Sequence, residues 1–377
     1  YVPVDVSFEG MTWHHVGMRF KGDSTLQDSW AAGSEKLPFK LDFDEFEDQY
    51  PELDDQRFWG FKQLSFGNNV MDPSYLRDRM TADLFRDESV PVAAYTWARV
   101  FINDGSGSKY LGLYTLAEVP WKPMMLRCFG SDDGNVYKLN FGEEPWGTGG
   151  VAGPDSFKKK TNKDDGDYSD LQQVIDALHA DTSSADAWRA GLEAEFAVDD
   201  FVRWLAYNTV IDNWDVLDNN AYFYGDPSDG RVHWIPWDFD SAFPNESSDE
   251  DDEYWGEYDT GLDGTFDDED DFGSPTLEQV ELEMPLARKI LDDPVYWAVY
   301  VEAVASFTAG TFQLKEVSDR VYWHQDLIHP YVVGDNGERV EATFTDYDTF
   351  WASGEAMLTH TQARLEAVAT FLAKEGS

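Results

Sequence analysis

The most constraining part of this 377-residue chain runs from residue 207 to residue 243, where two polar loops flank a predicted β-hairpin. Before it, apolar side chains in 201–211 recur at three- and four-residue steps, which predicts a helix. An aromatic segment at 221–224, turn residues at 226–230 and a return at 231–235 predict two antiparallel strands. Because a hairpin reverses the chain, its two flanking loops are expected to meet at the same end of the sheet.

Four side chains in these loops are candidates for binding a hard cation. Asp215 and Asn220 belong to the first loop, and Asp238 and Asp240 belong to the second. Their oxygen atoms suit magnesium, whereas zinc prefers His or Cys. An Asp, an Asn five residues later, a hairpin and a second Asp also follow one another in the protein-kinase catalytic core, where they serve as base and metal ligands. The alternative is that two acidic turns simply end a hairpin in a very acidic protein.

The stretch resembles the spore coat protein H (CotH) kinase family, whose signature includes Gly/Asp-Asn-Trp-Asp, as at 212–215, and Pro-Trp-Asp-x-Asp, as at 236–240. Further blocks match this family at 58–64 (FWGFKQL), 72–78 (DPSYLRD), 82–86 (ADLFR), 111–114 (LGLY), 134–138 (GNVYK) and from 285 onward. The resemblance therefore extends over nearly the whole chain. It implies a secreted or surface-associated atypical kinase that transfers the γ-phosphate of ATP to Ser or Thr of a protein substrate, using Mg²⁺, with Mn²⁺ or Ca²⁺ as alternatives.

The fold class expected from this resemblance is α+β, an atypical protein-kinase-like fold with two lobes. Residues 1–120 read as strands with one long helix and are expected to form a β-rich N-lobe. Residues 121–377 are expected to form a mainly helical C-lobe that carries the 207–243 motif and an acidic insertion at 245–273. The two lobes together would make one functional domain. In this interpretation Asp215 is the catalytic base, while Asn220, Asp238 and Asp240 hold the metal.

Four further residues are candidate nucleotide contacts. Lys21 lies in a Lys-Gly-x-Ser turn that occupies the place of a phosphate-covering loop in the family, although a plain hairpin turn has the same sequence. Lys40 alternates with apolar residues on a predicted strand and could reach phosphates, unless it is a solvent-facing lysine at a sheet edge. The resemblance implies that Glu118 stands at the hinge that contacts adenosine. It implies in the same way that Lys138, at the end of a predicted strand, binds phosphate.

The chain departs from the family pattern at two positions, with Pro38 in place of the usual Ser and Trp121 where Asp is frequent. These departures favour a rival interpretation, a catalytically weak or inactive surface adhesin or matrix-binding protein that keeps the fold. The presence of Asp215, Asn220 and Asp238 favours the enzyme.

Two other segments allow alternative interpretations. Asp72 followed by Pro73 is typical of a helix start, so a helix is predicted from there, with Asp78 as a candidate acidic partner for the strand lysine. Lysines at 158–160 lie in a Gly- and charge-rich loop and would either recruit an anion or simply be solvated, and we expect the solvated loop. The acidic insertion would bind calcium, dock basic peptides or, as we expect, be mobile.

The charge of the chain restricts its partners and its environment. With 74 acidic and 28 basic residues, the formal net charge is −46. Self-repulsion of this size destabilises a compact state unless ions screen it, which points to a salt-rich environment or, second, a calcium-rich surface. Double-stranded DNA and anionic membranes are poor partners for such a chain, so no nucleic acid is expected.

The location is expected to be secreted or at the cell surface. No run of eighteen apolar residues is present, so no membrane span is predicted. The sequence begins with Tyr, and we expect that a signal peptide has been removed. Nothing in the sequence indicates the oligomeric state.

Overall fold

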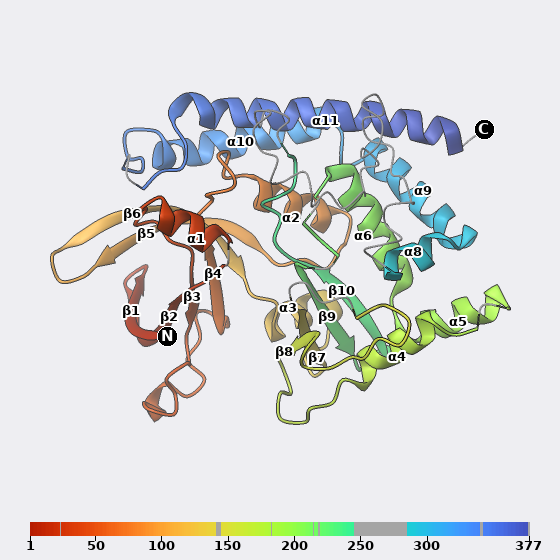
Figure 1. The fold of residues 1–377 in the computed structure, drawn as a ribbon. Helices are drawn as coiled ribbons and strands as arrows, with labels where there is room; N and C mark the ends of the chain where they lie inside the picture. The colour runs from red at the N-terminus through yellow and green to blue at the C-terminus, as the bar shows by residue number, and fades with distance from the viewer. Residues whose placement is uncertain are drawn as a thin grey trace. The chain divides into compact units, whose positions relative to one another are not determined.

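The computed structural model describes residues 1–22, 24–140, 145–181, 183–213, 215–217, 219–244, 285–339 and 342–375 (Figure 1). The expected acidic insertion at 245–273 lies outside the described residues. The chain divides into two compact units. Unit 1 comprises residues 1–79, 93–124 and 321–354, and unit 2 comprises residues 80–92, 125–320 and 355–377. Each unit contains one antiparallel sheet, so the fold is of the mixed α/β type.

The sheet of unit 1 has the strand order β1-β2-β3-β4-β6-β5. Its strands are β1 (Val2–Phe8), β2 (Met11–Phe20), β3 (Phe39–Asp42), β4 (Gln63–Gly67), β5 (Tyr95–Asn103) and β6 (Ser108–Glu118). The alternation predicted around Lys40 is confirmed, because Phe39, Leu41 and Phe43 are buried in one apolar cluster with Tyr114. Lys40 pairs across the sheet with Ser65 and so points to the opposite face.

The turn after Lys21 leads into a helix, so the plain hairpin interpretation of this turn is wrong. Helix α1 (Ser24–Ala31) lies between β2 and β3, which nevertheless pair with each other. The backbone N–H of Lys21 donates to the carbonyl of Pro38 over 3.0 Å, so a hydrogen bond joins the two ends of the segment between β2 and β3. The segment is therefore a helical insertion between two neighbouring strands.

Helix α2 (Arg77–Asp87) begins four residues after Pro73, the first helical residue that the Asp72-Pro73 pair predicts. The Asp72 carboxylate instead accepts hydrogen bonds from the backbone N–H groups of Ser74 and Arg77, at 3.0 and 2.9 Å. This carboxylate organises a turn ahead of the helix, and Tyr75 within that turn has a φ of 62°. The apolar side chains of the segment are nevertheless buried, namely Leu76, Met80, Leu84 and Phe85.

A buried ion pair ties the C-terminal part of unit 1 to its sheet. Lys36 Nζ lies 2.7 Å from Glu338 Oε1, and both side chains are completely buried. Tyr75 donates to Glu338 over 2.9 Å, and the backbone N–H of Leu113 donates to it over 2.7 Å. Gly112 has a φ of 146°, and a Cβ there would come within 2.9 Å of both charged side chains. Burial lowers the pKa of Lys36 to about 8, although Glu338 opposes this shift.

Unit 2 is built on the sheet β10-β9-β7-β8. Its strands are β7 (Asn135–Leu139), β8 (Phe157–Lys159), β9 (Ala221–Asp226) and β10 (Arg231–Pro236). The helices of this unit are α4 (Ser169–Leu178), α5 (Ala185–Glu195), α6 (Val198–Ile211), α8 (Pro285–Leu291) and α9 (Pro294–Ala309). The predicted hairpin and the helix before it are thus confirmed.

Among the described residues, four helices contribute residues to both units, namely α2, α3 (Lys122–Phe129), α10 (Leu314–Val332) and α11 (Tyr347–Glu375). Unit 1 also contains a short 3₁₀ helix, η1 (Pro51–Leu53). Within the described ranges, no helix is both long enough and apolar enough to cross a lipid bilayer.

Candidate functional site

The first polar loop follows the C-terminal end of α6, which hydrogen bonds of Asn208 stabilise. Asp212 adopts a left-handed conformation with a φ of 64°, and its backbone N–H donates to the carbonyl of Asn208 over 2.9 Å. The Asn208 side chain, which is fully buried, donates to the carbonyl of Asn213 over 2.9 Å. Asn and Asp tolerate the left-handed region better than other non-glycine residues. The loop therefore begins in a defined direction.

Asp215 and Asn220 are bonded to each other across this loop. Asn220 Nδ2 lies 2.8 Å from Asp215 Oδ2 and 3.0 Å from the backbone carbonyl of Asp215. Asn219 Nδ2 approaches the other carboxylate oxygen at 3.4 Å. Asn220 is 7 % exposed, and Asp215 is partly exposed. The carboxylate of Asp215 is thus held in place and remains accessible.

The hairpin register brings the second loop to Asn220. Pro236 pairs with Ala221 at the end of the β9–β10 ladder, and the backbone N–H of Trp237 donates to the carbonyl of Asn220 over 2.9 Å. Asn220 and Asp238 both have positive φ, at 49° and 64°, so the chain turns sharply on either side of this bond. Asp238 therefore lies one residue beyond a direct contact with the first loop.

Two lysines lie beside the ring of Tyr222 in β9. Lys138 pairs with Tyr222 across β7 and β9, and its Nζ lies 5.9 Å from the ring centroid. Lys160 Nζ lies 6.0 Å from the same centroid. Burial and the charge of Asp238 raise the pKa of the Tyr222 hydroxyl. Two lysines therefore lie beside this aromatic ring, and the charge of Asp238 acts on its hydroxyl group.

Sequence reasoning missed Lys160, since the lysines at 158–160 were expected to form a solvated loop. The segment instead forms β8 at its start, and Lys159 is buried in an ion pair with Asp165. Lys158 is exposed, as predicted. Exposure alternates along residues 157–159, as it does in a strand. The sequence does not predict this strand, because Phe157 is its single apolar residue.

Asp240 lies at the far end of the second loop. Between it and Asp238, Phe239 is fully buried and packs edge-on against Phe85, with ring centroids 5.5 Å apart. Asp240 itself is partly exposed, and Ser241 Oγ approaches its carboxylate at 3.4 Å. The buried ring therefore anchors the loop between the two carboxylates.

Lys21, Lys40 and Glu118 belong to unit 1, whereas the other predicted site residues belong to unit 2. Lys40 pairs with Ser65 of β4, whereas Glu118 pairs with Leu64, the residue before Ser65 on the same strand. Side chains alternate along a strand, so Lys40 and Glu118 point to opposite faces of the sheet. Glu118 is buried, and it lines a small hollow. The hollow is lined further by Phe61, Lys62, Gln63, Val119, Trp121, Pro123 and Met124.

The family model of the CotH kinase protein family matches residues 18–368. The chain belongs to the CotH kinase protein family. It is also 25% identical over 191 residues to the inner spore coat protein H of Bacillus subtilis (strain 168). This similarity covers 49% of the chain and 51% of the relative, so the chain matches about half the length of that protein.

In this CotH-family chain, the face of the unit 1 sheet that carries Lys40 also carries a pair of buried carboxyl groups. Asp42 is bonded to Gln63, and Asp44 forms ion pairs with Lys62 and Arg57. Burial raises the pKa of Asp42 to about 6, while the hydrogen bond from Gln63 and the charge of Lys62 oppose the shift. Despite burial, Lys62 holds the pKa of Asp44 below its ordinary value. The pKa values of the two carboxyl groups are thus shifted in opposite directions.

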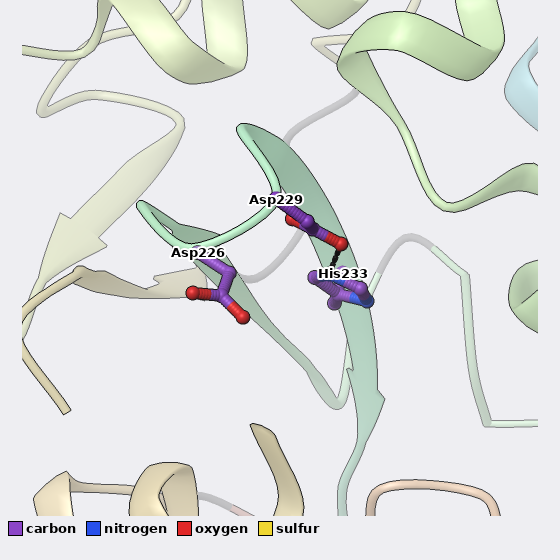
Figure 2. A group of neighbouring side chains, drawn as sticks. All are labelled: Asp226, Asp229 and His233. Atoms are coloured by element: carbon purple, nitrogen blue, oxygen red, sulfur yellow. Dashed lines mark hydrogen bonds and ion pairs between the residues drawn. The ribbon is translucent and has the colours of Figure 1, made fainter. Parts of the chain in front are cut away.

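A second group of potential metal ligands lies at the turn end of the β9–β10 hairpin (Figure 2). Asp226, Asp229 and His233 each offer an atom within 4.8 Å of the others. However, Asp229 Oδ2 already accepts from Arg231 at 2.7 and 2.9 Å and from His233 Nε2 at 3.1 Å. The Asp226 carboxylate accepts from the backbone N–H of Ser228 over 2.8 Å. These contacts are those of a turn that its own side chains stabilise.

Proposed function

We propose that this protein is an atypical protein kinase of the CotH type, which transfers the γ-phosphate of ATP to a Ser or Thr hydroxyl of a protein substrate in a Mg²⁺-dependent reaction. The observation that carries the proposal is the bonded pair of Asp215 and Asn220 beside the Asp238 loop. It occurs in a chain whose family match covers residues 18–368.

The side chains of these loops suit a hard cation. Asn220 commits its amide nitrogen to Asp215, so its oxygen is the atom that can serve as a ligand. Asp238 and Asp240 add partly exposed carboxylates. An amide oxygen and carboxylates, without His or Cys, are typical of a Mg²⁺ site. When bound, Mg²⁺ would neutralise charge on the phosphate oxygens.

Asp215 is proposed to orient the substrate hydroxyl and to accept its proton. This role requires a carboxylate whose position is fixed, and the amides of Asn219 and Asn220 supply that restraint. Lys138 and Lys160 are proposed to offset phosphate charge. A protein with a net charge of −46 needs such local cations to accept an anionic nucleotide.

The proposed fold is a two-lobed, kinase-like α+β arrangement, in which the sheet of unit 1 belongs to the N-lobe. Lys21 and Lys40 are proposed phosphate contacts, and Glu118 is a proposed adenosine contact. The hollow beside Glu118 is much smaller than ordinary ligand pockets, so a bound adenosine would extend well beyond it. Because Lys40 and Glu118 point to opposite faces of the sheet, a nucleotide on the Lys40 face would meet Glu118 through its backbone.

The name of the Bacillus subtilis relative supports a location at a surface or coat, and we propose that this protein is secreted or surface-associated. Its acidity suits a salt-rich environment. A rival function, a surface adhesin that has lost phosphotransfer, is favoured only by Pro38 and Trp121, the two departures from the family pattern.

Calorimetric titration of ATP in high salt, with and without Mg²⁺, tests the proposal. We expect micromolar binding that requires Mg²⁺ and is lost in Asp238→Ala. Asp226→Asn, which alters the other end of the same hairpin, is the matched control and should bind like the parent. Asp215→Asn should bind ATP but transfer no phosphate to casein. Absence of ATP binding by the parent under every condition would exclude the kinase and favour the adhesin.

A further inference from the structure

Two side chains of α11 bind the last carbonyl groups of α6, from which the Asp215 loop departs. Arg364 Nη2 donates to the carbonyl of Thr209 over 2.6 Å, and Arg364 Nε donates to that of Val210 over 3.2 Å. His360 Nε2 lies 3.1 Å from the carbonyl of Ile211, which can only accept, so this nitrogen carries the proton. The final carbonyls of a helix have no partner inside the helix. Here α11 supplies a partner for the carbonyl group of each of three consecutive residues.

These contacts are shielded from solvent. Arg364 is 4 % exposed and His360 is 8 % exposed. The guanidinium lies at the C-terminal end of α6, where the helix dipole favours a positive charge. Burial raises the pKa of Asp212, the residue that follows α6, and the charge of Arg364 opposes that shift. Because water does not compete for these groups, the end of α6 depends on α11 for its hydrogen bonds.

The same helix end also receives the second loop. The carbonyl of Ile211 lies 3.4 Å from the backbone N–H of Phe243, at the end of the Asp238 loop. The ring of Phe243 packs against the His360 ring, with centroids 5.8 Å apart. One carbonyl group therefore joins the loop that carries Asp215, the loop that carries Asp238, and α11.

We propose that His360 and Arg364 are positioning residues of the phosphotransfer site. They fix the C-terminal end of α6 and so hold the Asp215 and Asp238 loops in register, without contact to the substrate themselves. The inference rests on the proposed function, and it extends that function to α11, which neither the motif nor its spacing implicates. Phosphotransfer depends on positioning, so a displacement of about 1 Å can lower the rate by roughly a hundredfold.

The test compares variants that differ only in hydrogen bonding. His360→Phe keeps an aromatic ring beside Phe243 but removes the donor, whereas His360→Gln keeps an amide donor. Arg364→Met removes both bonds to α6 but keeps much of the buried volume. Thr361→Val is the matched control, because this buried hydroxyl donates to the carbonyl of Met357 within α11.

Steady-state transfer to casein and calorimetric binding of Mg²⁺-ATP are measured for each variant, together with the melting temperature. We expect kcat to fall about 10- to 100-fold in His360→Phe and Arg364→Met, with the KM for casein nearly unchanged. His360→Gln should recover most of kcat, and Thr361→Val should resemble the parent. Equal kcat in all folded variants, or loss of kcat only in proportion to unfolded protein, would overturn the proposal.

Amide hydrogen exchange separates this inference from the proposed function. We expect faster exchange at 212–220 and 236–243 in His360→Phe than in Thr361→Val, whether or not the parent transfers phosphate. If the parent is inactive and exchange rises in this way, the kinase proposal fails while the restraint of the two loops by α11 stands. Unchanged exchange in both segments would contradict the restraint itself.

Discussion

The side-chain amide of Asn220 donates to both the carboxylate and the backbone carbonyl of Asp215, at 2.8 and 3.0 Å. These two bonds close the loop between Asp215 and Asn220, which are five residues apart in the sequence. The amide uses its nitrogen for this closure and retains its oxygen for a cation. One residue therefore serves both the proposed base and the proposed metal site.

Replacing Asn220 with Leu should disable both functions at once. We expect kcat for phosphotransfer to fall by about a hundredfold or more, because Asp215 loses its restraint, and Mg²⁺-ATP affinity to fall by at least about tenfold. Asn219→Leu removes only the 3.4 Å contact and should have a much smaller effect on both quantities. Steady-state kinetics and calorimetry on the two variants provide the comparison. Equal losses in both would show that the loop responds to any substitution.

Replacing only one member of the buried pair Lys36 and Glu338 should lower the free energy of unfolding strongly. Lys36→Met leaves Glu338 buried without its cation, and we expect the free energy of unfolding to fall by about 3–5 kcal/mol. The double variant Lys36→Met/Glu338→Leu should recover most of this loss, because no uncompensated charge remains. Guanidinium denaturation followed by tryptophan fluorescence measures both. A loss below about 1 kcal/mol in the single variant would contradict this account of the pair.

Asp42 should make the stability of the protein depend on pH in mild acid. Its folded pKa of about 6 lies above the ordinary value of 3.8, so the folded state binds the proton more tightly than the unfolded state does. The stabilisation it contributes is fully present below about pH 3.8 and is lost as the pH rises through about 6. Asp42→Asn, a neutral mimic, should therefore stabilise the protein by up to about 2–3 kcal/mol at pH 7.5 and by much less at pH 4.5.

Denaturation of the parent, Asp42→Asn and Asp54→Asn at both pH values measures this dependence. Asp54 is exposed, so its substitution controls for the removal of one negative charge. If Asp42→Asn lowered stability equally at both pH values, the hydrogen bond from Gln63 would matter more than the charge.

The net charge of −46 should make folding depend on salt. Screening weakens the repulsion among carboxylates, so we expect the melting temperature to rise steadily between 0.1 and 2 M KCl. Calcium chloride at matched ionic strength distinguishes general screening from specific calcium binding, since only the latter would raise the melting temperature at millimolar concentrations. A melting temperature that is the same at all salt concentrations would exclude a salt-rich environment as the reason for the acidity.

The local elements of the site could be predicted because their geometry is local. A helix, a loop, a two-stranded hairpin and a second loop follow one another between 198 and 243, and each has a periodicity or turn composition of its own. The antiparallel reversal then fixes which loop ends meet. The start of α2 was predicted too early because Asp72 satisfies a turn as well as it would cap a helix.

Contacts between distant parts of the chain were decided only by the tertiary structure. Lys36 and Glu338 are 302 residues apart, and Arg364 and Thr209 are 155 residues apart. No local periodicity encodes such a partner, because a buried charge or an uncapped helix end can be satisfied by any segment that packs against it. The sequence by itself determined which residues could do chemistry and the order of the elements that carry them. The packing of α11 onto α6 determined what holds those residues still.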